Sequence, residues 1–148
     1  MNKVEVWQID CAELREQTAL LAEYAAECGI PALGEPSPQW DMYAVMESAG
    51  VWHLVGAFVN EELAGFAAVL VMVSPHYGVK LASVESMFVS QKYRASGAGI
   101  RLMDAVETYA QQAECKALMY SAPAGSRLEA MLGKLCIRTS SIFCKPLG

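Results

Sequence analysis

The sequence lacks most features that mark membrane, secreted or nucleic-acid-binding proteins. Its longest apolar run, Leu63 to Ser74, is too short to cross a bilayer and is better explained as a buried strand. The first residues contain no apolar segment of the signal-peptide kind. The net charge of −5 argues against nucleic acid as the main partner. These absences favour a globular cytoplasmic protein that is not bound to a membrane.

Cysteine and histidine are too scattered for an obvious metal or disulfide site. The cysteines include no Cys-x-x-Cys pair and lie at Cys11, Cys28, Cys115, Cys136 and Cys144. Their odd number and wide spacing favour reduced thiols, although Cys136 and Cys144 could approach each other across a terminal hairpin. The two histidines, His53 and His76, have no second ligand at a suitable spacing, so we expect no metal site.

What is present indicates one folded domain over residues 1–148. The chain is 54% hydrophobic, enough to build a core. Residues 1–90 carry a net charge of −9 and residues 91–148 one of +4. This asymmetry suits a basic half that meets an anionic cofactor and an acidic half that meets a cationic substrate. Two ordinary solvated surfaces would give the same numbers, and charge alone does not separate these readings.

Periodicity and turn residues predict an α/β domain with a mostly antiparallel sheet. The expected elements, in order, are a strand at 4–8, a helix at 10–29 capped by Asp10 and Glu13, a helix from Ser37-Pro38 to Ala49, strands at 51–59 and 63–73 joined by a hairpin at 60–62, a strand at 81–89, a helix at 99–114, a strand at 117–121, a helix at 126–134 and a closing strand pair at 135–145. Trp40, Tyr43 and Met46 have helical spacing and are expected to pack the second helix on the sheet.

The most informative stretch is Arg94-x-x-Gly97-x-Gly99, between a predicted strand and a predicted helix. Glycines at a helix start leave backbone N–H groups exposed, and the helix dipole favours an anion there. Ile100-Arg101 does not fit a P-loop, and Leu102 replaces the third glycine of a dinucleotide fingerprint. The stretch therefore predicts a phosphate-binding turn, and a regulator that binds ATP or NAD is disfavoured.

This turn, together with the order of elements, resembles the GNAT superfamily of N-acetyltransferases over the whole chain. Within that superfamily the chain looks like short proteins of phages and prophages, to which the turn at Pro75–Gly78 and the Ser121-Ala122-Pro123 segment contribute. The resemblance implies a GNAT fold, a mixed and mostly antiparallel central sheet flanked by helices and splayed between its fourth and fifth strands. It also implies an acyltransferase that moves an acetyl group from acetyl-CoA to a primary amine by direct attack.

The resemblance further implies where acetyl-CoA binds. Its pantetheine arm would pair with the backbone of the fourth strand, at Met87, Phe88 and Val89, like an added strand. Its pyrophosphate would lie on the N–H groups of the loop, at Arg94, Ala95, Ser96, Gly97, Ala98, Gly99 and Ile100. The acidic half of the chain suggests a cationic acceptor such as a peptide amine, a polyamine or an amino-containing small molecule. The sequence leaves homodimer formation open.

Glu85 is the candidate general base. It is the only charged residue between Lys80 and Lys92, and we expect it on the same face of its strand as Ser83, Met87 and Val89. A carboxylate within an apolar strand is costly unless it has a partner or a function. A strand-end glutamate in solvent or paired with an arginine is the alternative.

The general acid is harder to assign. The family pattern resembles Leu-Tyr-x-Lys-Leu-Gly-Phe, and this chain has Leu132 at the tyrosine position and Cys136 at the glycine. Tyr120 is the candidate substitute, with Ser121 and Ser126 as weaker ones, and solvent can also protonate a thiolate. Tyr120 as an ordinary core aromatic is the competing interpretation. The missing tyrosine also supports a rival function, a non-catalytic CoA-binding or interaction domain.

Overall fold

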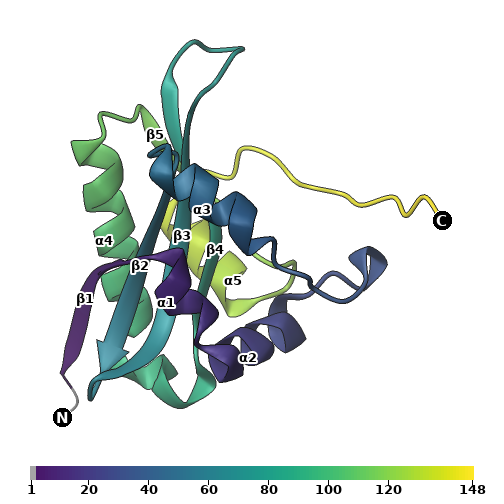
Figure 1. Cartoon of the computed structure of the whole chain (residues 1–148). Helices are drawn as coiled ribbons and strands as arrows, with labels where there is room; N and C mark the ends of the chain where they lie inside the picture. Colours follow the sequence, from purple (N-terminus) through teal and green to yellow (C-terminus); the bar gives the residue numbers. More distant parts are fainter. Residues whose placement is uncertain (1–2) are drawn as a thin grey trace.

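The computed structural model describes residues 3–148, and its elements follow the predicted order up to the last helix. They are β1 (Val4–Ile9), α1 (Cys11–Arg15), α2 (Thr18–Cys28), η1 (Pro31–Leu33), α3 (Trp40–Ser48), β2 (Trp52–Val59), β3 (Glu62–Val73), β4 (Lys80–Val89), η2 (Gln91–Ser96), α4 (Ala98–Gln112), β5 (Ala117–Tyr120) and α5 (Arg127–Leu135). Figure 1 shows them arranged around one central sheet. Among the described residues, no helix has the length and apolar character of a membrane span.

The strands form one sheet in the order β1-β2-β3-β4-β5. The first four are antiparallel neighbours, and β5 pairs with β4 in parallel. The tight β2–β3 hairpin is confirmed, since Asn60 and Glu61 both take positive φ values, 51° and 67°. Positive φ at both central residues is typical of a type I′ turn, whose twist suits a two-residue hairpin. The sheet is therefore mixed and mostly antiparallel, as predicted.

Each face of the sheet has its own hydrophobic cluster. On one face α4 buries Leu102 and Val106, both fully inaccessible, against strand residues such as Val69 and Val84. On the other face, α1, α2 and α3 cover a cluster that includes Leu54, Phe66 and Phe88. Trp40, Tyr43 and Met46 pack on this second cluster, as expected from their helical spacing. The molecule thus has three layers, with α4 and the α1–α3 group on different faces of the sheet (Figure 1).

The first predicted helix is broken in two. Asp10 and Glu13 form the expected capping box, and Gly29 ends α2, but residues 16–17 interrupt the helix. Leu14 and Leu20 both belong to the same buried cluster. An unbroken helix would turn two side chains six residues apart onto different faces, whereas the break brings both to the core. The second helix also begins later than expected, at Trp40 rather than at Pro38.

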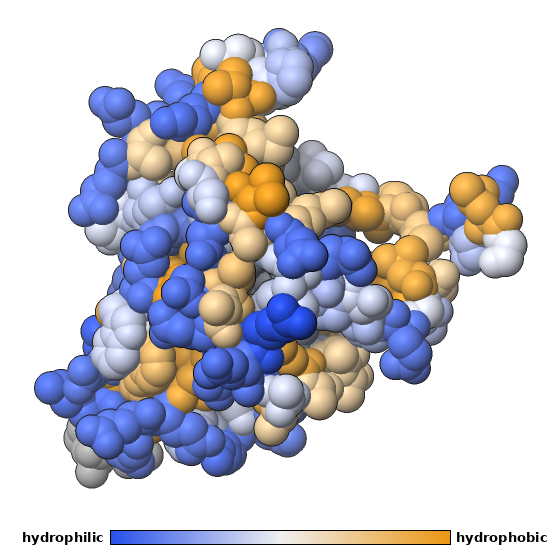
Figure 2. Space-filling model, in the orientation of Figure 1, coloured by the Kyte–Doolittle hydropathy of each residue, from blue (hydrophilic) through white to orange (hydrophobic). Residues whose placement is uncertain are grey.

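The predicted closing strand pair is wrong. Residues 136–148 form no strand, and their apolar side chains are exposed, Ile137 by 88% and Phe143 by 90%. This segment runs away from the body of the molecule in Figure 1, and Figure 2 shows apolar residues at its far end. A hairpin with no further strand beside it is marginal in water, and β5 offers an edge of only four residues. Cys136 and Cys144 therefore do not meet, and all five cysteines are unpaired.

Candidate active site

The predicted phosphate-binding turn lies where η2 meets α4. Gly97 ends η2 and caps α4 with a left-handed φ of 89°, a conformation that glycine adopts without strain. No side chain caps α4, and the N–H groups of Gly99 and Ile100, in its first turn, have no intrahelical partner. A Cβ at Gly97 would meet nothing within 4 Å, so the space above the turn is open. The turn thus offers free donors and a helix dipole to an anion.

The other loop residues named from the sequence are placed differently. Ala95 is exposed, whereas Ala98 is fully buried under the turn. The hydroxyl of Ser96 accepts a hydrogen bond from the Ala98 N–H at 3.2 Å and donates one to the Tyr93 carbonyl at 2.5 Å. Ser96 therefore shapes the turn from inside, and the free donors are those of Gly99 and Ile100.

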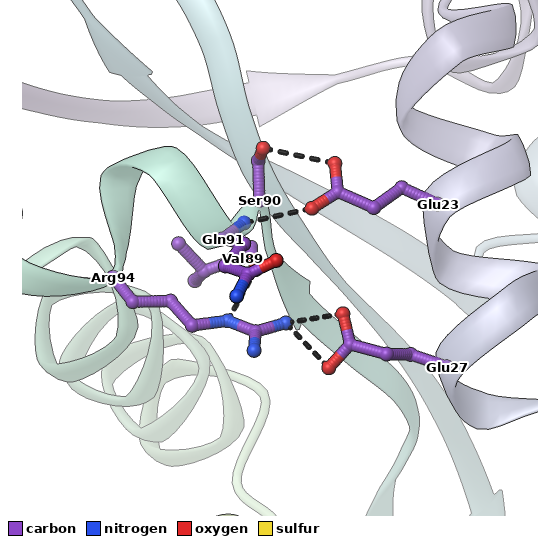
Figure 3. A network of polar contacts seen from close by, with 6 residues as sticks. All are labelled: Glu23, Glu27, Val89, Ser90, Gln91 and Arg94. Atoms are coloured by element: carbon purple, nitrogen blue, oxygen red, sulfur yellow. Dashed lines mark hydrogen bonds and ion pairs between the residues drawn. The ribbon is translucent and has the colours of Figure 1, made fainter.

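Two glutamates of α2 hold this loop. The Arg94 guanidinium donates to both carboxylate oxygens of Glu27, at 2.6 and 2.8 Å, and to the Val89 carbonyl at 3.1 Å (Figure 3). Glu23 accepts from the Ser90 hydroxyl at 2.9 Å and from the Gln91 N–H at 2.8 Å. The neighbouring Glu27 carboxylate raises the pKa of Arg94 further. The positive charge at the mouth of the turn is thus already paired with α2.

The open edge of β4 lies beside the turn. β4 and β5 pair only from Leu81 with Ala117 to Val84 with Tyr120, where β5 ends, so the remainder of β4 has no strand on that side. This is the predicted splay. The Ser90 N–H donates to the Ala64 carbonyl, which makes 90 and 64 a hydrogen-bonded antiparallel pair. By alternation, the backbone groups of Phe88 point to β3.

The same alternation directs the backbone groups of Met87 and Val89 toward the open edge. The Arg94 contact to the Val89 carbonyl agrees with this direction. Of the three strand residues named from the sequence, Met87 and Val89 therefore offer backbone to an added strand. Phe88 contributes its side chain to the core instead.

A β-bulge at Glu85 changes which face its neighbours share. Ala68 pairs with Ser86 and Val69 with Val84, so Glu85 is an extra residue in β4. Before the bulge, Val84 lies in the α4-side cluster, and after it Met87 packs on that same cluster. The expectation that Glu85 shares a face with Met87 and Val89 is therefore wrong, because one inserted residue reverses the alternation.

Glu85 faces the α1–α3 side of the sheet. Its charge contributes to raising the pKa values of Tyr24 and Tyr43, after the larger effect of burial on both phenols. The residue is exposed overall, yet partial desolvation raises the pKa of its carboxyl above the ordinary value of 4.5. A carboxylate with a raised pKa that remains accessible suits a general base.

A pocket of about 530 Å³ lies on this side of the sheet, a size within the usual range of small-molecule sites. Its aromatic lining comes from α2, α3, β2 and β3, at Tyr24, Trp40, Tyr43, Trp52 and Phe66. Ser86, next to Glu85 in β4, also lines it. The pocket therefore brings a set of aromatic side chains to the strand that carries the candidate base.

Tyr120 lies elsewhere. It pairs with Val84 at the end of β5 and packs against the α4-side cluster. Burial raises the pKa of its hydroxyl to about 12, with smaller contributions from Cys136, Glu107 and Asp104. A phenol of this pKa is a weaker acid than a thiol, whose pKa is about 8.5. Tyr120 can therefore donate a hydrogen bond to a thiolate, but full proton transfer is unfavourable.

The other acid candidates are no stronger. The Ser126 hydroxyl accepts from the Glu129 N–H at 3.1 Å and caps α5. Ser121 is exposed after the end of β5. Leu132 is half-buried on α5 and has no ionisable group. Among residues 3–148 there is also no cluster of three or more His, Cys, Asp or Glu side chains that could hold a metal ion.

Comparison with known proteins decides the family. The model of the acetyltransferase (GNAT) family matches residues 15–131. The chain belongs to the GNAT acetyltransferase family. It is therefore an acyltransferase by family. None of the curated proteins compared with it by sequence is significantly similar, and the resemblance to phage proteins in particular stays a prediction.

Solved structures agree on the fold. Ribosomal-protein-alanine N-acetyltransferase from Brucella melitensis biovar Abortus 2308 aligns with a TM-score of 0.75 and 21% identity, covering 99% of this chain and 100% of that one. An aminoglycoside acetyltransferase, meta-AAC0020, from an uncultured soil metagenomic sample aligns with a TM-score of 0.76 and 11% identity, covering 98% and 97%. Glucosamine-6-phosphate N-acetyltransferase from Arabidopsis thaliana gives 0.70 and 11%, covering 97% of each chain. At these identities the likeness shows the GNAT fold alone.

Sequence reasoning missed two parts of the site. Glu23 and Glu27 are four residues apart on α2, a spacing that puts both on one helix face, and this signal was available. The pocket around Trp52 and Phe66 had no such signal, because its lining comes from seven elements spread over residues 11–86.

Proposed function

We propose that this protein transfers an acetyl group from acetyl-CoA to a primary amine by direct attack. The observation that carries the proposal is the conjunction of three features: the glycine turn with free N–H groups, the open backbone edge at Met87 and Val89, and the accessible Glu85 carboxylate. All three lie along one strand and its exit loop. The cofactor supplies the activated acetyl group as a thioester.

Residues of the chain would bind the cofactor and remove the proton from the acceptor. The N–H groups of Gly99 and Ile100 hold the pyrophosphate, aided by the α4 dipole. The open edge of β4 holds the pantetheine arm by main-chain hydrogen bonds. Glu85 accepts the proton of the acceptor ammonium, directly or through water, and its raised pKa brings it closer to that of the amine.

Cofactor binding tests the first part. Acetyl-CoA is expected to raise the Tm, since a ligand at 100 times its Kd stabilises the fold by about 2.7 kcal/mol. Gly99→Glu should abolish this shift by placing a carboxylate at the phosphate position. Gly99→Ala is the matched control, because a Cβ there meets only Val89 Cγ2 at an ordinary 3.9 Å. An undiminished shift in Gly99→Glu would place the cofactor elsewhere.

Thiol release separates the enzyme from its rival. The absence of a tyrosine at Leu132 favours a non-catalytic CoA-binding domain as the second candidate. An acetyltransferase releases free CoA thiol faster when an amine is added, and Glu85→Gln slows that release. Cofactor binding without amine-dependent thiol release, over a panel of amines, would establish the non-catalytic function instead.

A further inference from the structure

The junction between β4 and η2 links the two parts of the proposed cofactor site. β4 ends at Val89, on the open edge, and η2 then leads to the glycine turn. Between them lies Ser90, the only polar or charged residue among residues 3–148 that is buried, at 8% exposed. Its N–H donates to the Ala64 carbonyl at 2.8 Å, and its carbonyl accepts from the Tyr93 N–H at 2.9 Å. The backbone of Ser90 is therefore tied both to the sheet and to η2.

η2 begins without a cap of its own. A serine at an N-cap usually accepts a hydrogen bond from an N–H of the first turn. The Ser90 hydroxyl makes no such bond and donates to one Glu23 oxygen at 2.9 Å. The other Glu23 oxygen accepts from the Gln91 N–H, the first N–H of η2, at 2.8 Å (Figure 3). Glu23 therefore caps η2 from α2, 67 residues earlier in the chain than Ser90.

α2 has its own attachment to the core. Leu20 is 7% exposed, and the Tyr24 ring lies edge-on to the rings of Phe66 and Phe88, at centroid distances of 5.4 and 5.5 Å. These apolar contacts do not involve the Glu23 carboxylate. The cap thus reaches the junction from a helix that is held on the sheet by other side chains.

The charge of Glu23 is unfavourable for a cofactor site, because a carboxylate repels a pyrophosphate. The hydrogen bond to Glu27 contributes most to raising the pKa of Arg94, and the charge of Glu23 adds to it. If charge were the only effect, removing either glutamate would strengthen the binding of an anion. The two glutamates differ in their partners, however. Glu27 binds the Arg94 side chain, whereas Glu23 binds the backbone and the buried hydroxyl of the junction.

We propose that Glu23 is a positioning residue for acetyl-CoA, which caps η2 from α2 and so fixes the turn relative to the open edge of β4. The proposal rests on the cofactor site proposed above. η2 has six residues, about 12 Å of 3₁₀ helix, so a rotation of about 10° at its start moves its far end by about 2 Å. Hydrogen bonds to phosphate tolerate less. One ligand that spans edge and turn gains from both only if the junction keeps its geometry.

Two substitutions of Glu23 separate its hydrogen bonds from its charge. Glu23→Ala removes both, whereas Glu23→Gln removes the charge and keeps an amide that can accept from the Gln91 N–H and donate to the Ser90 hydroxyl. We expect Glu23→Ala to raise the Kd of acetyl-CoA about tenfold by calorimetry, and Glu23→Gln to leave it at or below the wild-type value. Equal Kd values for the two variants, whether both lower or both higher than in the wild type, would overturn the proposal.

Glu27→Ala is the matched control. It removes the same charge from the same helix, about one turn further along, and leaves both Glu23 hydrogen bonds in place. We expect it to lower the Kd of acetyl-CoA, because Arg94 is then free for the pyrophosphate. If Glu27→Ala weakened binding as much as Glu23→Ala, a general supporting role of α2 would explain both losses, and Glu23 would have no role of its own.

A fragment of the cofactor separates positioning from damage to the turn. ADP carries an adenosine and a pyrophosphate but no pantetheine arm, so it engages the turn without the open edge. In Glu23→Ala, its Kd is expected to change less than about twofold while that of acetyl-CoA rises about tenfold, since only the larger ligand needs both parts aligned. Equal losses for ADP and acetyl-CoA would show that the turn itself is disturbed and would overturn the positioning role.

The same measurements separate the role of Glu23 from the function on which it rests. If the wild type does not bind acetyl-CoA, the proposed function fails, and the role of Glu23 fails with it. If the wild type binds acetyl-CoA and Glu23→Ala binds it equally well, only the role of Glu23 is wrong. Should Glu23→Ala not fold, as judged by its thermal unfolding, Ser90→Ala decides. It removes only the hydroxyl that donates to Glu23 and should raise the Kd about threefold, and an unchanged Kd counts against the proposal.

Discussion

At the residue scale, Glu85 combines two properties that are seldom found together. It is exposed, which gives a substrate access, yet its surroundings desolvate the carboxyl enough to raise its pKa. Glu85 follows Val84 of the α4-side cluster by simple alternation and therefore faces the α1–α3 side, next to Tyr24 and Tyr43.

Glu85→Gln is expected to lower turnover most at intermediate pH, above the pKa of the Glu85 carboxyl and below that of the acceptor amine. In the wild type, the rate should rise with pH as the Glu85 carboxyl loses its proton, at a pH above the ordinary glutamate value of 4.5. In Glu85→Gln, the rise in rate that follows deprotonation of Glu85 disappears. The difference in rate between the variant and the wild type shrinks at high pH, because more of the acceptor amine is already neutral. Steady-state kinetics from about pH 4 to about pH 10.5, a range that includes the ordinary pKa values of a carboxyl (about 4.3) and an amine (about 10.4), would show this. Wild-type rates at every pH would remove Glu85 from the mechanism.

The same Glu85→Gln variant should also be more stable than the wild type at neutral pH, and equally stable at low pH. A carboxyl with a raised pKa in the folded state holds its proton more tightly there than in the unfolded chain, so wild-type stability falls as pH rises from 4.5 through the raised value. Glu85→Gln is therefore expected to be more stable than the wild type at pH 7. It should lose this advantage near pH 3.5, which is below the ordinary pKa of a glutamate side chain, about 4.3. Thermal unfolding at the two pH values measures it, with the exposed Glu107→Gln as control. A variant less stable at pH 7 would contradict the sign.

Tyr120→Phe is expected to cost less than about tenfold in turnover, about 1.4 kcal/mol in the barrier. The Tyr120 hydroxyl has a pKa of about 12 and is a poor proton donor to a thiolate. The aromatic ring packs against the α4-side core in both the wild type and the variant. Initial rates with saturating acetyl-CoA test this, alongside the Tm as a measure of folding. A thousandfold loss with unchanged cofactor binding would make Tyr120 the general acid.

At the scale of elements, α2 joins the two halves of the site. Its Glu23 and Glu27 hold the turn that precedes α4, while Leu21 and Tyr24 of the same helix line the pocket on the α1–α3 side. A pyrophosphate on the turn brings negative charge close to Arg94, which Glu27 now holds at 2.6 Å. Cofactor and Glu27 are therefore expected to compete for one guanidinium.

Glu27→Gln should tighten acetyl-CoA binding, because it removes the carboxylate that competes for Arg94. We expect a severalfold lower Kd by calorimetry, together with a slightly lower Tm of the free protein. The pair is partly exposed, 32% for Arg94 and 44% for Glu27, so its own stabilisation is small. Arg94→Gln is the complementary control and should weaken binding. A weaker affinity in Glu27→Gln would show that α2 supports the turn rather than competing with the cofactor.

Local patterns predicted the elements well where each one is determined by its own residues. The stripe of α4, the capping box at Asp10 and the hairpin at Asn60 and Glu61 are short-range features, and all were confirmed. The bulge at Glu85 depends on how β4 aligns with β3, and the break before α2 depends on which leucines reach the core. Neither is encoded in a periodicity, so sequence reasoning wrongly placed Met87 and Val89 on the same face of the strand as Glu85.

At the scale of the whole molecule, each face of the sheet combines a buried cluster with a cavity. On the α4 side, Leu102 and Val106 are fully buried in a packed cluster, and a cavity of about 750 Å³ opens between α4, β1 and β2. The α1–α3 face leaves a pocket of about 530 Å³ and an unpaired donor at Trp52, which are costs in the absence of a ligand. Packed clusters and cavities thus occur on both sides of one sheet, and the proposed cofactor site lies at the open edge of β4.

The C-terminal segment belongs to neither face, and deleting residues 138–148 is expected to leave the Tm unchanged within about 2 °C. Its side chains are exposed, Phe143 by 90% and Leu147 by 94%, so their removal loses almost no buried surface (Figure 2). Acetyl-CoA should shift the truncated and full-length proteins equally. Leu102→Ala, at a fully buried position, is the positive control and should cost about 2–5 kcal/mol. A fall of many degrees in the truncated protein would show that the segment packs in solution, with the free edge of β5 as the nearest strand to receive it.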